Sequence, residues 1–273
     1  MGKIIYMINH INNSIINFVC CGQSGDMTHE LYVIKNLYKL YNIKANLYIA
    51  DYTYGGIDCC GHFLFDLERT YNDWKQTVCL QPYINSFSIL PKNFTENYIN
   101  LNSWRSFNNS KNKSWSYFMS ECFNFPIQED YKWIYCSTKI NELKNKILIH
   151  QSNIRHNTNF NWTKIIQGNE DNVLFITNSD SEYNNFKSIH SSIELYKVSD
   201  IYDLLIALNS CKLFIGNQSM PFAMASALDI PRIGILYYNS ASYYQNEINV
   251  SKNLSWFLDE NNKYNSDNVS ILI

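Results

Sequence analysis

The chain has 273 residues, a formal net charge of −2, and 46% hydrophobic against 17% charged residues. This composition can build a packed core, so it excludes a disordered, collagen-like or low-complexity protein. The slightly acidic charge gives no general attraction to nucleic acid or to an anionic membrane, and no basic stripe is visible in the sequence. The length suits one large domain or two of modest size.

Eight cysteines are scattered along the chain without a C-x-x-C pair, and most of them lie inside apolar runs. We interpret them as free thiols on small buried side chains rather than as a disulfide framework. The N-terminus has no secretory signal pattern, and no apolar run approaches the ~18 residues of a membrane helix. The sequence therefore predicts a cytoplasmic protein without a transmembrane segment.

Short apolar runs alternate with helical spacing along the first half, which is typical of β-α units in a parallel sheet. The pattern predicts strands over 15–21, 45–50 and 85–90 and helices over 28–41 and 114–123. The Asn-rich stretch 101–113 is expected to be a loop. A polar segment at 139–146 indicates a helix end or a linker near the middle of the chain.

The second half repeats the alternation more regularly. It predicts strands over 147–150, 173–177, 194–198, 213–215 and 232–236, and helices that begin near Trp162, Ser181, Asp200 and Pro221. Asp200 is a typical N-cap, and Pro221 is a typical first residue of a helix. Because each half contains a strand–polar loop–helix unit, we predict an α/β protein. Its two Rossmann-like domains, residues 1–143 and 144–273, are expected to face each other across a cleft.

Ligands of an open parallel sheet bind at the carboxyl ends of its strands, and three predicted loops there are rich in polar groups. The first is G-Q-S-G-D-M-T-H. Gly22 and Gly25 allow a tight turn and a close approach of the backbone to a ligand. Asp26 is a candidate general base, with Ser24 and His29 near it in the loop. The alternative is that Asp26 only caps the following helix.

The second loop, Q-S-N-I-R-H, follows the strand predicted at 147–150. Ser152 offers a hydroxyl group, and the Arg155 guanidinium can bind two phosphate oxygens at once. A solvated polar loop is the alternative. His150 and His156 are not spaced with a cysteine or carboxylate as metal ligands would be, so we predict no metal site.

The third loop, F-I-G-N-Q-S-M-P-F-A-M-A, is the most specific feature of the chain. A strand ends at Gly216, the small polar residues Asn217, Gln218 and Ser219 follow, and Pro221 begins an apolar, Ala-rich helix. This order directs backbone N–H groups and the Ser219 hydroxyl at one point, which suits a diphosphate. The alternative is a capped turn that binds no ligand.

The segment C-K-L-F-I-G-N-Q-S-M-P-F-A-M-A-S-A-L-D-I-P-R resembles the nucleotide-sugar-binding segment of glycosyltransferase family 9, the heptosyltransferase-like enzymes. The family pattern is roughly F-I-G-N-D-S-G-P-x-H-x-A-A-A-L-G-x-P. The segment S-G-D-M-T-H is similar to the family's G-D-x-x-H loop. The resemblance spans about residues 15–236. It implies the GT-B architecture, with the donor held mainly by the C-terminal domain, and an inverting, metal-independent transfer.

Carried over residue by residue, the resemblance implies that Asp26 is the catalytic base and that Gly25 and His29 are its neighbours. Arg155 lies in the loop where the family has a basic phosphate ligand, and Glu182 is a candidate for binding the donor ribose. The complete set of donor-binding residues that we expect is Ser152, Arg155, Glu182, Gly216, Asn217, Gln218, Ser219 and Pro221.

Three departures from the family pattern concern the donor turn. Gln218 stands where an Asp is usual, Met220 stands where a Gly is usual, and the segment 222–224 lacks the family His. We therefore expect a glycosyltransferase that needs no cofactor and transfers a sugar from a nucleotide-sugar donor to a glycan or other hydroxyl acceptor. The alternative is a degenerate module that holds a nucleotide sugar without transferring it. An epimerase or dehydrogenase is a third class, but no G-x-G-x-x-G follows a strand.

Overall fold

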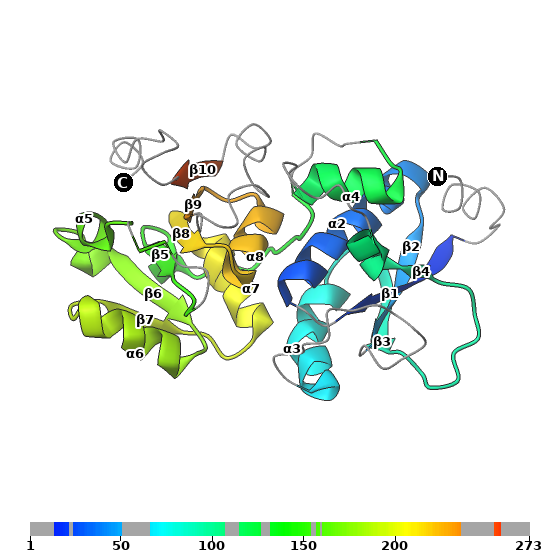
Figure 1. The fold of residues 1–273 in the computed structure, drawn as a ribbon, viewed down its shortest axis with the longest axis horizontal. Coiled ribbons are helices and arrows are strands. Elements are labelled where there is room, and N and C mark those ends of the chain that lie inside the picture. The colour runs from blue at the N-terminus through cyan, green and yellow to red at the C-terminus, as the bar shows by residue number, and fades with distance from the viewer. Residues whose placement is uncertain are drawn as a thin grey trace. The chain divides into compact units, whose positions relative to one another are not determined.

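The computed structural model describes residues 14–21, 24–50, 66–106, 115–126, 132–153, 157–158, 160–235 and 254–257 (Figure 1). The chain divides into two compact units, Met1–Tyr135 and Cys136–Ile273. We call them the N-terminal and C-terminal units and describe each by itself. Each contains one parallel β-sheet with helices, so the predicted pair of Rossmann-like α/β folds is confirmed.

The boundary between the units lies between Tyr135 and Cys136, earlier than the predicted 143/144. Hydrogen bonds on its two sides explain the difference. The Tyr135 N–H donates to Oε1 of Gln81 at 2.8 Å, within the N-terminal unit. The Asn209 amide donates to the carbonyl oxygens of Cys136 at 3.1 Å and Thr138 at 2.9 Å, within the C-terminal unit. The polar segment that we interpreted as a linker is therefore bound to the second unit.

The N-terminal sheet has four parallel strands in the order β3-β2-β1-β4. Its strands are β1 (Ile15–Cys21), β2 (Lys44–Ala50), β3 (Ile84–Ile89) and β4 (Ile99–Asn100). Its helices are α2 (Ser24–Tyr41), α3 (Leu67–Cys79), α4 (Trp115–Phe123) and the 3-10 helix η1 (Leu101–Ser106). Alternate side chains of the strands point to one face, so Phe18, Leu47 and Phe87 form a buried row across the sheet.

Four elements of the N-terminal unit differ from the sequence prediction, and one of them is the short strand β4, which the pattern did not predict. Helix α2 begins at Ser24 rather than Thr28, so most of the predicted G-Q-S-G-D-M-T-H loop is helical. The residues 101–106 form η1 in the predicted loop. Helix α3 was not predicted because its buried positions, Thr70, Trp74, Thr77 and Val78, include two threonines that weaken the apolar pattern.

The C-terminal sheet has six parallel strands in the order β10-β9-β8-β5-β6-β7. Its strands are β5 (Ile147–His150), β6 (Val173–Thr177), β7 (Glu194–Lys197), β8 (Leu213–Asn217), β9 (Arg232–Ile235) and β10 (Leu254–Phe257). Its helices are α5 (Trp162–Ile166), α6 (Asp180–Ile189), α7 (Ile201–Ser210), α8 (Met220–Leu228) and the 3-10 helices η2 (Asn141–Leu143) and η3 (Glu170–Asn172). Numbered from β5, this is the 3-2-1-4-5-6 order of the doubly wound dinucleotide-binding fold.

The C-terminal unit follows the sequence prediction closely because β5, β6 and β8 are continuous apolar runs, as expected for a parallel sheet buried on both faces, whereas β7 is a partly exposed edge strand. All four residues of β5 are buried, and Ile149, Phe175 and Ile215 are neighbours in its core. Three details differ. Strand β8 extends to Asn217, Pro221 is the second residue of α8 rather than the first, and strand β10 was not predicted.

Five cysteines have described side chains, and all five are free thiols as predicted. Their burial differs from the prediction: Cys20 is buried, Cys79 is exposed, and Cys122, Cys136 and Cys211 are partly buried. Within the described ranges, no helix is long and apolar enough to cross a membrane.

The strand order of both units reverses next to the first strand. The reversal lies between β1 and β4 in the N-terminal unit and between β5 and β8 in the C-terminal unit. Ligands of open α/β sheets bind outside the carboxyl ends of the strands at such a point. The fold therefore places the three predicted loops at the binding edges of the two sheets.

Candidate active site

A pair of hydrogen bonds joins the carboxyl ends of β5 and β8. Ser152 follows β5, Asn217 ends β8, and both residues are buried. The Ser152 N–H donates to Oδ1 of Asn217 at 3.0 Å, and Nδ2 of Asn217 donates to Oγ of Ser152 at 2.8 Å. The structure thus brings these two predicted residues together. Their mutual bonds hold the start of one loop against the start of the other.

Gly216 has a packing role within β8. A Cβ at this position would lie 2.7 Å from Cζ of Phe214 and 3.2 Å from the carbonyl oxygen of His150. A side chain there would collide with the Phe214 ring of the same strand and would crowd the β5 backbone at His150. The contribution of Gly216 to a donor site stays a prediction.

The N-terminus of α8 is not capped by its own side chain. Ser219 is the N-cap, but its hydroxyl donates to the carbonyl oxygen of Asn217 at 3.1 Å and makes no bond to the first turn. Four other helices differ, because each N-cap side chain accepts from a first-turn N–H: Asp66, Asn161, Ser179 and Asp200. The positive end of α8 is therefore left for an acceptor that Ser219 does not supply.

Gln218 lies between Asn217 and the N-cap of α8. It is 7% exposed, and both polar atoms of its carboxamide are buried without a hydrogen-bond partner. Native proteins pair most buried polar groups, so Gln218 is an exception at the predicted binding turn.

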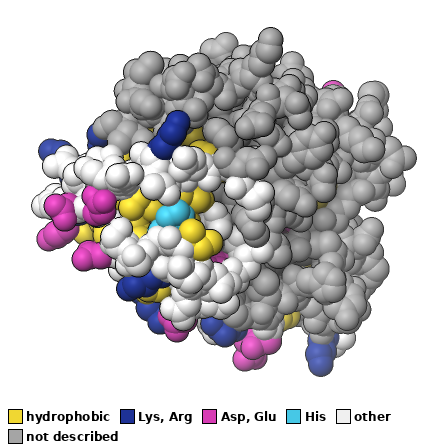
Figure 2. Space-filling view, turned by 60° about the vertical axis from the view of Figure 1, so that its left-hand side comes forward, with side chains coloured by type: hydrophobic (Ala, Val, Ile, Leu, Met, Phe, Trp, Pro, Cys, Tyr) yellow, Lys and Arg dark blue, Asp and Glu magenta, His cyan; other side chains and the backbone are white. Residues whose placement is uncertain are grey.

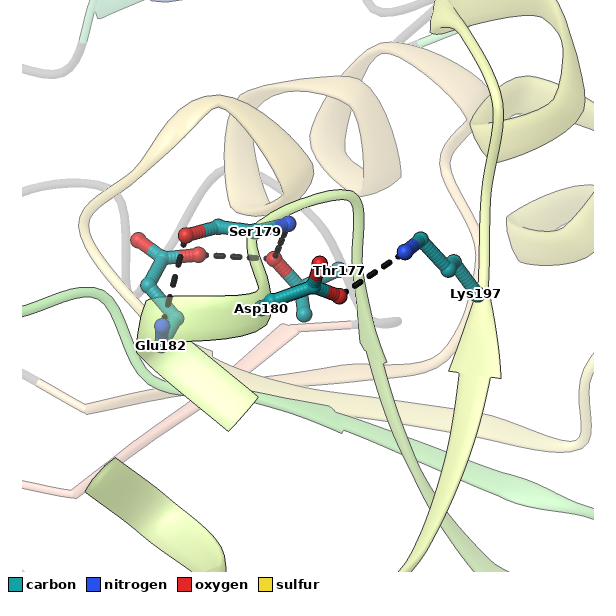
Figure 3. Close-up of polar contacts among 5 residues, drawn as sticks. All are labelled: Thr177, Ser179, Asp180, Glu182 and Lys197. Carbon is teal, nitrogen blue, oxygen red and sulfur yellow. Dashed lines mark hydrogen bonds and ion pairs between the residues drawn. The ribbon is translucent and has the colours of Figure 1, made fainter. Parts of the chain in front are cut away.

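A third polar group lies at the carboxyl end of β6, the strand next to β5 (Figure 3). Oγ1 of Thr177 donates to Oε2 of Glu182 at 2.7 Å and accepts from the Ser179 N–H at 3.0 Å. Oγ of Ser179 accepts from the Glu182 N–H at 3.3 Å and caps α6. The predicted ribose ligand Glu182 is therefore held at the same edge of the sheet as Ser152. The neighbouring Lys197–Asp180 pair, at 2.8 Å, is exposed and contributes little to stability.

The supporting role of Thr177 was missed at the level of sequence, although Ser179 and Glu182 form the S-x-x-E capping-box pattern. In that pattern the side chain of the glutamate accepts a hydrogen bond from the backbone N–H of the N-cap residue. Here the Ser179 N–H donates to Thr177 instead, and the Glu182 carboxylate accepts the Thr177 hydroxyl.

His150 is the last residue of β5. Its Nδ1 lies 2.9 Å from the carbonyl oxygen of Ile176, and its side chain is buried. Burial lowers the pKa of His150, although the nearby Glu182 carboxylate and the bond to Ile176 oppose the shift. The ring is therefore neutral near pH 7, donates through Nδ1, and ties β5 to β6.

In the N-terminal unit, Asp26 lies in the first turn of α2 and is partly buried. The alternative interpretation of Asp26 as the N-cap is wrong, because the helix begins two residues earlier at Ser24. A Cβ on Gly25 would meet no atom within 4 Å. Packing among the described residues therefore does not require glycine next to Asp26.

His29 lies three residues after Asp26, so the two share one side of α2. It is buried, and burial lowers the pKa of His29 to about 3. Its ring centroid lies 6.2 Å from that of Trp133, whose Nε1 donates to the carbonyl oxygen of Thr28 at 2.7 Å. His29 is therefore a neutral packing residue near neutral pH. Ser24, the first residue of α2, accepts from Nε1 of Trp74 at 3.4 Å.

Two predicted site residues, Gly22 and Arg155, lie outside the described residues. Among the residues that are described, no three histidine, cysteine or acidic side chains are grouped as metal ligands. On the face shown in Figure 2, the basic and acidic side chains of the described part are interspersed and form no continuous basic stripe.

No protein-family model matches the sequence, and no curated protein matches it. Solved structures do match. The E. coli heptosyltransferase WaaC, solved with ADP, is similar with a TM-score of 0.65 and 11% identity over 94% of this chain and 98% of that chain. A glycosyltransferase family 9 protein from Veillonella parvula is similar with a TM-score of 0.55 and 11% identity, over 94% of this chain and 90% of that chain.

The dodecameric, iron-containing heptosyltransferase TibC has a TM-score of 0.58 and 11% identity, over 90% of this chain and 62% of that chain. The chain therefore has the fold of the heptosyltransferases and of a glycosyltransferase family 9 protein, as the resemblance implied.

Proposed function

We propose that the protein is a glycosyltransferase that takes its sugar from a nucleotide-sugar donor and gives it to a hydroxyl acceptor. The observation that carries the proposal is the set of polar groups at one edge of the C-terminal sheet. The Ser152–Asn217 bond pair, the uncapped start of α8 and the held Glu182 carboxylate lie at the ends of the adjacent strands β8, β5 and β6. The shared fold supports a sugar transfer, because WaaC was solved with ADP.

The three groups suit the parts of a nucleotide sugar. The open N-terminus of α8 offers backbone N–H donors and a positive partial charge to a diphosphate. The Glu182 carboxylate is an acceptor, so its free oxygen suits the hydroxyl groups of a ribose. Arg155 is assigned to the phosphates on the resemblance alone.

The proposed chemistry is a single displacement. Asp26 takes the proton of the acceptor hydroxyl, and the oxygen attacks the anomeric carbon from the face opposite the nucleotide, so the configuration inverts. The bond from the anomeric carbon to the diphosphate oxygen breaks, and the nucleoside diphosphate leaves. The α8 N-terminus and Arg155 stabilise its negative charge.

A thermal-shift screen with ADP, UDP, GDP and their sugar conjugates tests the proposal first. A ligand that binds only the folded protein raises its free energy of unfolding, by about 2.7 kcal/mol at a hundredfold excess over Kd, and therefore raises its melting temperature. We expect one nucleotide family to raise it in wild type and to raise it less in Ser219→Gly combined with Glu182→Gln. If no nucleotide or nucleotide sugar shifts the wild type, the proposal is wrong.

The proposal uses no metal ion, whereas TibC, which shares the fold, contains iron. The described residues of this chain do not supply a group of three metal ligands. We therefore expect sugar transfer to keep its full rate after dialysis against a chelator. The measurement is the initial rate before and after dialysis, and a loss restored by added Fe²⁺ or Mg²⁺ would contradict this part of the proposal.

A binding module without transfer activity is the second candidate. The family histidine corresponds to Ala223, which is 4% exposed, and Met220 replaces a glycine at the start of α8. Calorimetric titration with the nucleotide sugar found by the screen, together with an assay for release of the nucleoside diphosphate, separates the two. Binding without any turnover in the presence of acceptor hydroxyls favours the module.

A further inference from the structure

The edge of the N-terminal sheet where its strands begin carries exposed apolar side chains, and we call it the amino edge. In a parallel β-α unit each helix returns to the edge where the next strand begins, so α2 and α3 end there. Of the five large hydrophobic side chains that are exposed in the described part of the chain, four lie at this edge. They are between 36% and 51% exposed: Ile15, Leu40, Tyr41 and Leu80.

Backbone hydrogen bonds join the chain segments that form the amino edge. The Lys44 N–H donates to the carbonyl oxygen of Ser14 at 2.8 Å, and the Ala45 N–H donates to the carbonyl oxygen of Tyr83 at 2.9 Å. Ile15 and Lys44 are partners in the register of β1 and β2. The starts of β1, β2 and β3 are therefore side by side, and the exposed apolar side chains belong to one surface.

The charge at the amino edge is positive. The segments that build it contain three exposed lysines and no acidic residue; the segments are 14–17, 36–44 and 75–85, and the lysines are Lys39, Lys44 and Lys75. Residues 1–13, which precede Ser14 in the chain, add one lysine and no acidic residue. One carboxylate borders the edge, since Oε2 of Glu96 accepts from Nδ2 of Asn17 at 2.8 Å. The whole chain has a net charge of −2, so the excess of lysine is local.

Exposed apolar side chains bordered by polar ones mark surfaces that bind a protein or a membrane. A standard protein interface takes about 800 Å² from each partner, which four side chains that are only about half exposed do not supply. An anionic membrane asks for less. Apolar side chains enter the boundary between headgroups and acyl chains, and each lysine near the surface strengthens binding about fivefold. The lysines and the small apolar area therefore favour a membrane over a second copy of the chain.

We propose that the amino edge of the N-terminal unit binds the surface of an anionic membrane. The apolar side chains enter the boundary region, and the lysine ammonium groups contact the lipid phosphates. The opposite edge of the same sheet, where α2 begins with Asp26 in its first turn, then faces away from the lipid. This inference goes beyond the proposed function, because it assigns a surface that the sugar transfer does not use.

Co-sedimentation of the full chain with lipid vesicles tests the proposal. The vesicles are pure phosphatidylcholine and an equal mixture of phosphatidylcholine and phosphatidylglycerol, and no nucleotide is added. We expect wild type to bind the mixed vesicles about 10- to 100-fold more tightly than the neutral ones. Salt screens charges at a surface, so 1 M NaCl, where the Debye length is about 3 Å, should remove most of this preference.

Two double variants separate the charged and the apolar contributions. Lys39→Gln combined with Lys44→Gln should weaken binding to the mixed vesicles about 10- to 30-fold. Leu40→Gln combined with Leu80→Gln should weaken it about tenfold. All four side chains are exposed, so the melting temperatures should stay close to that of wild type.

The matched control lies on α6 in the C-terminal unit. Lys187→Gln combined with Ile189→Gln removes an exposed lysine and the fifth exposed apolar side chain, and it should bind vesicles as wild type does. Equal losses in this control and in the amino-edge variants would mean that the binding has no defined surface, and the proposal would be wrong.

Three further outcomes overturn the proposal. Wild type does not sediment with either kind of vesicle, or it binds both kinds equally and Lys39→Gln with Lys44→Gln changes nothing. In the third outcome, wild type forms a concentration-dependent dimer without vesicles and Leu40→Gln with Leu80→Gln abolishes it, so a second copy covers the edge. Each outcome leaves the proposed function standing, because the nucleotide screen tests that function separately.

Discussion

The two units share the strand order around their first strand but use the polar groups of their binding edges differently. In the N-terminal unit, three indole N–H groups bind the first two turns of α2: Trp74 to Ser24 at 3.4 Å, Trp133 to Thr28 at 2.7 Å and Trp104 to Glu30 at 3.2 Å. In the C-terminal unit, the start of α8 is uncapped and Gln218 is unpartnered. Side-chain bonds support both edges, but only the second combines them with a helix start that its own N-cap side chain leaves uncapped.

Under the proposed function, we expect a division of labour between the two edges. A general base must be held within hydrogen-bond reach of the proton that it removes, so the helix that carries Asp26 gains from rigid support. A donor site must gain its bonds when the ligand binds, so unpaired groups in the free protein are useful there. The following predictions test whether the first edge controls turnover and the second controls donor affinity.

The largest effect is expected at Asp26. Asp26→Asn removes the proton acceptor and keeps the size of the side chain, so transfer should fall by about 100- to 10,000-fold while donor affinity is unchanged. The measurements are kcat for sugar transfer and the donor affinity from calorimetric titration. Glu68→Gln is the matched control, because Glu68 is an exposed acidic residue in the first turn of α3. Full activity in Asp26→Asn would show that another group is the base.

The next largest effect is expected when the hydrogen bond of one tryptophan side chain is removed from either unit. Trp133→Phe removes the buried bond to Thr28 and leaves a gap, and we expect a loss of ~1–3 kcal/mol of stability with a lower kcat. Trp162→Phe is its counterpart, because Nε1 of Trp162 donates to Oε1 of Gln151 at 2.6 Å next to Ser152. That variant should weaken donor binding instead. If both variants change the same kinetic constant, the division between the two edges is wrong.

These contacts also show why sequence reasoning reached the C-terminal edge more fully than the N-terminal one. The turn after β8 and the loop after β5 follow continuous apolar strands, so Ser152 and Asn217 were found as neighbours of strand ends. The three indole bonds join residues 50, 105 and 74 positions apart, and no local pattern records them.

Other features depended on facts that only packing reveals. Most of the predicted loop belongs to helix α2, because Ser24 and Gly25 are compatible with the start of a helix as well as with a turn. The packing reason for glycine at position 216 is the nearby ring of Phe214, which the sequence pattern does not show, while the predicted donor-binding role of Gly216 stays a prediction. The lack of a partner for Gln218 cannot be read from the letters N-Q-S, since it depends on what surrounds the amide.

A smaller effect is expected on acid stability. The pKa of His29 is about 3 in the folded protein, below the 6.5 of an unfolded histidine, because the ring is buried. The unfolded state therefore binds the proton first, so stability is complete above pH 6.5 and falls as the pH drops towards 3, by at most about 1.4 kcal/mol per pH unit.

Urea unfolding at pH 7 and pH 5 measures this dependence. His29→Gln should remove part of the loss between the two pH values, whereas His190→Gln should remove less, because His190 is only partly buried. His150 also has a lowered pKa and should retain its own share of the loss in both variants. An unchanged pH dependence in His29→Gln would show that the buried ring is not the source.

The smallest effect compares two buried threonines, one from each unit. Oγ1 of Thr177 holds the Glu182 carboxylate at 2.7 Å, whereas Oγ1 of Thr77 in α3 is buried without a partner. Thr177→Val should free Glu182 and weaken the nucleotide sugar by about 3- to 10-fold, since one hydrogen bond to a charged group is lost. Thr77→Val removes an unpaired hydroxyl, so it should leave donor affinity unchanged and keep or raise the melting temperature. The measurements are calorimetric titration and thermal unfolding of both variants. If Thr177→Val behaves like Thr77→Val, Glu182 does not depend on Thr177 to bind the donor, and the bond between them serves only the local structure at the start of α6.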